Sequence, residues 1–312
     1  MIASLSALLL LVASPGLRAT QNVPASTEKA PAFVQKLTAE DGTLTIQTGA
    51  HKLTATGKPD VWLIGAVHVG EAAYYKELQA LLDAQDVVPF EGVKPSKEQV
   101  EQAAAAKVAA EQSGEEVKKP EGLYTVLGEM LGLEFQNSQI SYKNPNWINS
   151  DLSWDEMNEL NKQAPEGSAS FDTVQQLMDP NSPTAKMMVT LLKSPLPGLK
   201  DALKVFFVSK LGDSGGETTG MDAGFQKIVL HERNKAVVAD FGKVLERPEA
   251  PKSIGILYGA AHHAEIERSL MDKYGYKVAE IKWFSAAKAN PNTLDEAGKK
   301  MLEMFNKTNP PK

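Results

Sequence analysis

The chain has 312 residues, of which 42% are hydrophobic and 23% charged, a balance typical of a soluble globular protein and too apolar for a disordered one. Its formal net charge of -6 provides no general positive field, which argues against nucleic acid or an anionic membrane surface as a partner. The absence of cysteine excludes disulfides, a thiol nucleophile and thiolate ligands, so any bound metal must be held by His, Asp or Glu.

The amino-terminal end has the pattern of a secretory signal. An apolar run, Ala7 to Ala13, is too short to span a bilayer and is followed by small residues with a cleavage point after Ala19. No Lys or Arg precedes the run, so a buried amino-terminal helix is the alternative. We expect a signal peptide over 1–19, a flexible lead-in over 20–32 and a single domain over 33–312. The protein would then be periplasmic or secreted, with no stable membrane insertion after signal removal.

The first half of the domain has a strand, turn, helix and strand in succession. Polar and apolar residues alternate over 43–48, which predicts a half-exposed strand. Continuous apolar residues over 61–64 predict a strand that is buried on both faces. A helix over 71–83 and a second strand over 86–91 are expected to follow.

The same order recurs near the carboxyl end. An apolar run over 253–258 predicts a buried strand, a turn follows over 259–262, and then come a helix over 264–273 and a strand over 278–284. The recurrence indicates an internal duplication. We therefore predict an α/β (α+β) fold in which two strand-turn-helix-strand repeats form a central sheet.

The region between the two repeats, about 94–250, is predicted to be a large helical insertion. It contains helix-forming runs over 96–116 and 123–135, and a capping box of Ser153 and Glu156 begins another helix. A long helix is expected over 221–245, ending before a proline.

Both turns carry the motif Gly-x-x-His, at Gly65 to His68 and at Gly259 to His262. In an open α/β sheet, ligands bind beyond the carboxyl ends of the strands. Glycine permits a backbone bend there that directs the imidazole into the crevice. We therefore expect His68 and His262 to lie close together at equivalent places in one site, with a structural role for each as the alternative. His263 is expected to point away from this site.

Glu91 follows the second strand, directly after an apolar stretch. A carboxylate buried there without a partner would be costly, so a role as metal ligand or general base is one interpretation. The other is an exposed charge at the end of a strand.

Three more polar residues are candidates for the same site. Arg233 and Asn234 fall on the apolar stripe of the long helix, where polar groups need partners. Arg233 could hold a substrate carboxylate or form a bidentate pair with Glu91, or it could form an ion pair that only supports the fold. Asp151 precedes the capping box and either faces the site or stabilises the helix terminus.

Four motifs follow one another along the chain: Gly65-Ala-Val-His68-Val-Gly, Pro-Phe-Glu91-Gly, His-Glu-Arg233-Asn234 and Gly259-Ala-Ala-His262. Their order and spacing over Val61 to Phe284 resemble the TraB/PrgY/GumN family, which includes the Wnt-cleaving TIKI proteases. The resemblance implies an α/β core with a helical insertion, and a metal-dependent peptidase centre that uses both histidines and the glutamate. Asp151 is similar to an acidic loop residue of related bacterial members.

The expected function is therefore that of a metal-dependent hydrolase acting on a peptide or a small molecule. His68, Glu91 and His262 would hold a divalent ion such as Zn, Mn or Co, and Arg233, Asn234 and Asp151 would complete the catalytic set. Two alternatives stay open: a non-catalytic metal- or haem-binding protein similar to ChaN, and a degenerate family member that antagonises a signal.

Overall fold

The computed structural model describes residues 33–113, 122–163, 168–194, 196–213 and 222–308. The predicted signal peptide and lead-in lie outside these residues. Within them, no helix is both long and apolar enough to cross a membrane.

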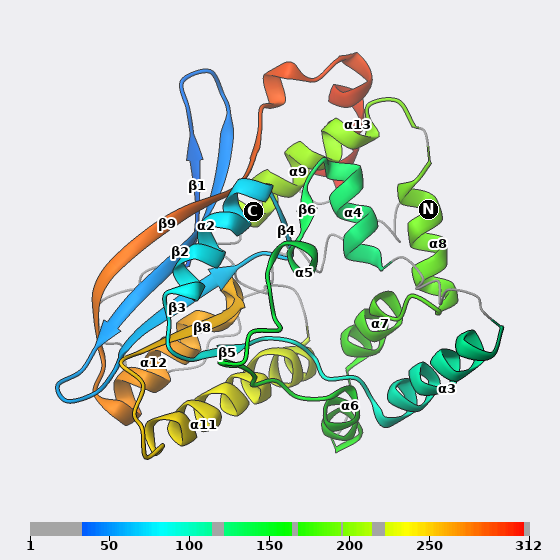
Figure 1. Cartoon of the computed structure of the whole chain (residues 1–312). Coiled ribbons are helices and arrows are strands. Elements are labelled where there is room, and N and C mark those ends of the chain that lie inside the picture. Colours follow the sequence, from blue (N-terminus) through cyan, green and yellow to red (C-terminus); the bar gives the residue numbers. More distant parts are fainter. Residues whose placement is uncertain (1–32, 114–121, 164–167, 195, 214–221, 309–312) are drawn as a thin grey trace.

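The structure contains a mixed sheet of seven strands, and helices α3, α4, α6, α7 and α8 gather on one side of it (Figure 1). Its strands are β1 (Val34–Thr38), β2 (Leu44–Thr54), β3 (Asp60–Ala66), β5 (Val88–Phe90), β7 (Trp147–Asn149), β8 (Ser253–Gly259) and β9 (Lys277–Ala289). Two further short strands, β4 (Val69–Gly70) and β6 (Glu134–Phe135), pair separately. This arrangement confirms the predicted α/β class.

The helices lie mainly between β5 and β8 in the sequence. Those of the first half are α2 (Ala72–Asp83), α3 (Lys97–Ser113), α4 (Leu123–Leu131), α5 (Gln136–Gln139), α6 (Trp154–Gln163), α7 (Ala169–Met178), α8 (Pro183–Leu192) and α9 (Leu199–Asp213). Those of the second half are α10 (Ala223–Gln226), η1 (Lys227–Glu232), α11 (Arg233–Leu245), η2 (Ala260–His262), α12 (His263–Tyr274), η3 (Pro291–Thr293) and α13 (Glu296–Thr308).

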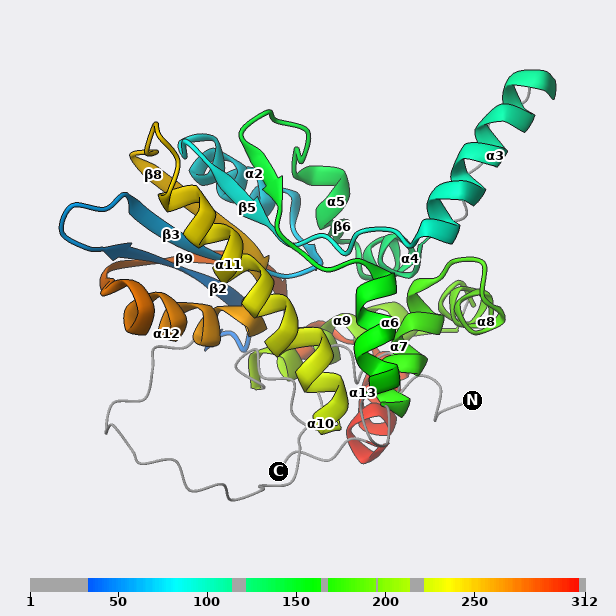
Figure 2. The same ribbon diagram turned by 90° about the horizontal axis from the view of Figure 1, so that it is seen from below.

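The sheet has a parallel part and an antiparallel part. Strands β3, β8, β5 and β7 are neighbours in that order and run parallel, whereas β2 pairs antiparallel with β1, β3 and β9. Helices α2 and α12 lie on opposite sides of the sheet (Figure 2). Because both faces are covered, the interior strand β3 is apolar and buried from Val61 to Ala66, as its continuous hydrophobic run predicts.

The four parallel strands end at one edge of the sheet, and this edge positions the candidate site. His68 follows β3, Glu91 follows β5, Asp151 follows β7 and His262 follows β8. Topology alone therefore brings together residues that are far apart in the sequence.

The two predicted repeats are present as elements but are not equivalent in the sheet. The returning strand of the first, β5, pairs in parallel with β8, whereas the returning strand of the second, β9, pairs antiparallel with β2. The motifs are also out of register, because Gly65 is opposite Tyr258 and Ala66 is opposite Gly259. The expectation that the two histidines occupy equivalent places is therefore wrong by one position along the strand.

The large helical insertion over about 94–250 is not confirmed, because this region also supplies a strand of the central sheet. Strand β7 pairs in parallel with β5, with Val88 opposite Trp147 and Phe90 opposite Asn149. Helix α3, from the same region, extends away from the rest of the molecule (Figure 2), and its described side chains are almost all exposed.

The long helix predicted over 221–245 is interrupted. It is described from Ala223, and a π-helical turn, η1, separates α10 from α11. A π turn contains an extra residue and therefore shifts the faces of the helix that follows it. Here α11 begins at Arg233, one of the predicted site residues.

Candidate functional site

The carboxylate of Glu91 is held at the end of β5 by the neighbouring strand β8. Its backbone N–H donates to the carbonyl of Leu257 at 2.9 Å, and its Oε2 accepts a hydrogen bond of 2.6 Å from the backbone N–H of Gly259. A Cβ atom at position 259 would lie 3.2 Å from this oxygen. Because Gly259, in the second Gly-x-x-His motif, has no side chain, the Glu91 carboxylate can reach its backbone N–H.

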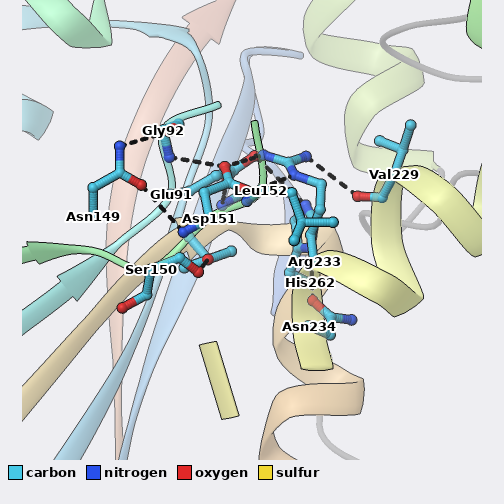
Figure 3. A network of polar contacts seen from close by, with 12 residues as sticks. Glu91, Gly92, Asn149, Ser150, Asp151, Leu152, Val229, Arg233, Asn234 and His262 are labelled. Carbon is cyan, nitrogen blue, oxygen red and sulfur yellow. Dashed lines mark hydrogen bonds and ion pairs between the residues drawn. The ribbon is translucent and has the colours of Figure 1, made fainter. Parts of the chain in front are cut away.

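Arg233 lies between two carboxylates, Glu91 and Asp151 (Figure 3). Its Nη2 donates to Glu91 Oε1 at 2.6 Å, and its Nε and Nη2 donate to the two oxygens of Asp151 at 2.8 and 2.7 Å. Its Nη1 donates to the carbonyl of Val229, in η1, at 3.2 Å. Such a fork of charge-assisted bonds fixes both the position and the plane of the guanidinium group.

Both carboxylate oxygens of Asp151 accept two hydrogen bonds each. In addition to Arg233, its oxygens accept from the backbone N–H groups of Gly92 at 2.9 Å and Leu152 at 2.7 Å. Asn149 joins the same segments, accepting from the Asp151 N–H at 3.1 Å and donating to the Gly92 carbonyl at 2.7 Å. Asp151 therefore lies beside Glu91 and Arg233, but its contacts support Arg233 and leave no oxygen directed at a substrate.

The buried imidazole of His262 faces Glu91, with 3.6 Å between Nε2 and Glu91 Oε1. Its Nδ1 lies 2.7 Å from Asn234 Oδ1, and Asn234 Nδ2 donates to Glu265 Oε2 at 2.8 Å. Because an ionised carboxylate only accepts, the amide of Asn234 must present its oxygen to His262, which donates from Nδ1. In its neutral form His262 thus directs an unprotonated Nε2 at Glu91.

The charges of Glu91, Asp151 and Arg233 sum to -1 when His262 is neutral. Burial raises the pKa of Glu91, but the charges of Arg233 and the two site histidines outweigh it and hold that pKa well below its usual range. Burial lowers the pKa of Arg233, and Glu91 and Asp151 more than offset this, so its pKa is raised. Glu91 is therefore ionised and Arg233 charged at neutral pH, and the surplus negative charge favours a cation beside Glu91.

His68 lies in the same site but in a different environment. Its side chain is accessible to solvent, and its ring centroid is 4.6 Å from that of Tyr124 in α4. The surrounding protein removes enough hydration to lower its pKa; the charge of Glu91 opposes this effect, and the charges of Arg233 and His262 add to it. His68 is thus neutral at pH 7 and within electrostatic range of the buried groups, whereas His262 is buried.

The predicted metal ligands are not arranged as a ligand set. Among the described residues, no three His, Asp or Glu side chains are placed to hold a metal ion. The chemistry of two of them fits a cation, because Nε2 of neutral His262 and Oε1 of Glu91 are both acceptors and face each other. The set of His68, Glu91 and His262 therefore stays a prediction.

His263 does not point into the site, as predicted, but it is fully buried. It belongs to a second polar group, in which its Nε2 donates to the Tyr258 carbonyl at 3.1 Å and the ring of Phe33 stacks on it. His51 stacks on the same Phe33 ring and donates from Nδ1 to Glu267 at 2.6 Å. Burial first, and the charge of His262 second, lower the pKa of His263 to about 3.

The sequence reasoning missed two members of the network, His231 and Glu265. Glu265 lies three residues after His262, and His231 lies three residues before Asn234, so each is one helical turn from a predicted site residue. That spacing is the only sequence signal for them, and it is weak without knowledge that α11 and α12 are neighbours.

Comparisons of the chain with protein-family models, with functionally characterised proteins and with solved structures found no match.

Proposed function

We propose that this site is the catalytic centre of a hydrolase, a metal-dependent peptidase in the first instance. The observation that carries the proposal is the opposed pair of acceptors, Nε2 of His262 and Oε1 of Glu91, at 3.6 Å. A hydrogen bond on the far side of each group fixes its orientation. The order of motifs that resembles the TraB/PrgY/GumN family supports the same reading, and the apolar amino-terminal segment supports a periplasmic or secreted location.

Each side chain has a separate task in this proposal. His262 and Glu91, together with His68, would hold a divalent ion, and such an ion supplies polarisation of the scissile carbonyl and activation of water. Arg233 keeps Glu91 ionised and fixes its orientation, while Asp151 fixes that of Arg233. Asn234 keeps the proton of His262 on Nδ1.

Of the three predicted ligands, His68 has the side chain that is exposed to solvent, and hence the one that a substrate would contact first. Because its pKa is lowered, its imidazole is neutral at pH 7 and can accept a proton from the attacking water or contribute a ligand. A peptide or small amide is the substrate class that this combination of groups serves.

The test is metal analysis of protein purified without a metal-binding tag, together with hydrolysis of a peptide library. We expect a bound divalent ion, loss of turnover with a chelator and recovery with added metal. His68→Ala and His262→Ala should lose both ion and turnover while the melting temperature changes little. Glu91→Gln that keeps the ion but loses turnover would indicate a base, and loss of both would indicate a ligand.

Glu303→Gln is the matched control, because it removes one carboxylate charge at an exposed position of α13. Full turnover in all three site variants would contradict the proposal. A visible absorbance spectrum of bound haem, without hydrolysis, would favour the binding-protein alternative.

A further inference from the structure

A chain of hydrogen bonds connects the buried imidazole of His262 with the protein surface. It runs from His262 Nδ1 to Asn234 Oδ1 at 2.7 Å, and from Asn234 Nδ2 to Glu265 Oε2 at 2.8 Å. His231 Nδ1 bonds the same carboxylate oxygen at 2.6 Å. The side chains of His231 and Glu265 are 49% and 38% exposed, whereas that of His262 is 5% exposed.

Two neighbouring helices build this chain. His231 lies in η1 and Asn234 in the first turn of α11, so both project from the same stretch of helix. Glu265 lies in the first turn of α12, which begins directly after His262. A single carboxylate oxygen thus joins the start of α11 to the start of α12.

The polarity of the chain is set at its outer end. An ionised carboxylate has no hydrogen to donate, so Glu265 can only accept from Asn234 and His231. The amide of Asn234 must then direct its nitrogen outward and its oxygen inward, and His262 must donate from Nδ1. Exchange of the two ends of that amide would reverse the tautomer of His262.

We propose that Glu265, held by His231, is a positioning residue that fixes the tautomer of His262 through Asn234. The chain is orienting and does not conduct protons, because the amide in its middle has no acid or base function near neutral pH. The consequence for the site is that Nε2 of His262 keeps its lone pair directed at Glu91.

For catalysis, this inference rests on the proposed function, since an imidazole in the wrong tautomer neither ligates through Nε2 nor accepts a proton there. The tautomer itself is a property of the free protein and can be measured without turnover.

The direct test reverses the polarity of the outer group with Glu265→Lys. Lysine offers only donors, so the Asn234 amide should turn its oxygen outward and its nitrogen toward His262. Nitrogen-15 NMR of the histidine side chains, with His262 assigned from a His262→Gln spectrum, should show the proton on Nδ1 in the wild type. In Glu265→Lys it should lie predominantly on Nε2.

A second substitution should restore the original state. In the double variant Asn234→Asp with Glu265→Lys, the new carboxylate accepts from both the lysine and His262, so the proton should return to Nδ1. Glu246→Lys is the control for charge, because it makes the same change at an exposed position at the end of α11 and should leave the tautomer unchanged.

An unchanged His262 tautomer in Glu265→Lys would overturn the inference, as would a double variant that folds without restoring Nδ1–H. If the double variant does not fold, Glu265→Ala is the deciding variant. Loss of the acceptor should give a mixture of both His262 tautomers. A His262 that keeps its proton on Nδ1 alone would contradict the inference. Where a divalent ion binds, Glu265→Lys should also weaken its affinity by about 10- to 100-fold. An inactive wild type would count against the proposed function only.

Discussion

At the scale of single residues, Arg233 is the group on which the other charges of the site depend. Its side chain is 6% exposed and lies between carboxylates that are 12% and 0% exposed. Removing the guanidinium would leave Glu91 and Asp151 buried without a cation, and breaking a buried ion pair in this way costs about 3–5 kcal/mol. We therefore predict that Arg233→Met lowers the free energy of unfolding by about that amount, as measured by urea denaturation.

The control for Arg233→Met is Lys243→Met in the same helix. Lys243 pairs with Asp240, but its side chain is 75% exposed, so its loss should cost less than about 1 kcal/mol. Equal costs for the two variants would show that Glu91 and Asp151 do not need Arg233.

His263 should make the protein less stable in mildly acidic solution. Its pKa is about 3 in the folded protein and ordinarily 6.5, so as pH falls the unfolded chain takes up the proton first. Its contribution to stability is complete above the unfolded pKa and declines toward the folded one, by up to about 1.4 kcal/mol per pH unit. Between about pH 6.5 and pH 5, we predict that His263→Gln loses about 1.6 kcal/mol less stability than the wild type.

The choice of glutamine isolates the titration, because its amide can still donate to the Tyr258 carbonyl but takes up no proton in this range. Identical urea midpoints for wild type and His263→Gln at both pH values would refute this assignment.

At the scale of elements, the site depends on how closely β8 approaches the end of β5. Gly259 has an ordinary extended backbone, with φ -53° and ψ 139°, so alanine meets no backbone strain there. Its Cβ would nevertheless press on Glu91 Oε2 at 3.2 Å and displace the hydrogen bond to the Gly259 N–H. We predict that Gly259→Ala costs about 1.5–3 kcal/mol, the usual value of a hydrogen bond to a charged group.

Gly122 provides a matched control for Gly259. Its backbone is similar, with φ -75° and ψ 152°, and a Cβ there would have no atom of the described residues within 4 Å. Gly122→Ala should therefore be neutral or slightly stabilising. A loss of stability in Gly122→Ala as large as in Gly259→Ala would show that contact with Glu91 is not the cause.

The elements with a strong local signal could be predicted from sequence. The continuous apolar runs of β3 and β8 gave both buried strands, and the capping box gave the start of α6, where Ser153 and Glu156 bond as expected. Strand β7 has only three residues, which is too short for a periodicity to be recognised. The π turn before Arg233 has no composition of its own and depends on contacts made in the folded chain.

The residues that make up the site could be predicted to a similar degree. Glu91, Arg233, Asn234 and His262 do form one connected group, because each is a polar residue at a position where burial demands a partner. The different environments of His68 and His262 could not be predicted, since they depend on the register between β3 and β8. The role of Glu265 depends in turn on the packing of α11 against α12.

At the scale of the whole molecule, the polar centre joins parts that are far apart along the chain. Arg233 is 82 residues from Asp151 and 142 residues from Glu91, and Gly259 is 168 residues from Glu91. The parallel strands β3, β8 and β5 likewise come from both ends of the domain and cannot pair until the region between them has been made. The region over about 94–250, which the sequence predicts to be an insertion, is thus an integral part of the site, because it supplies β7 and α11.

This wide separation has a consequence during synthesis. A ribosome releases the chain from the amino terminus, so Glu91 and Asp151 emerge well before β8 and His262. Until β8 and His262 have been made, Glu91 lacks both the Gly259 N–H and the imidazole that faces it. A nascent chain, or one truncated before β8, therefore lacks the assembled polar centre.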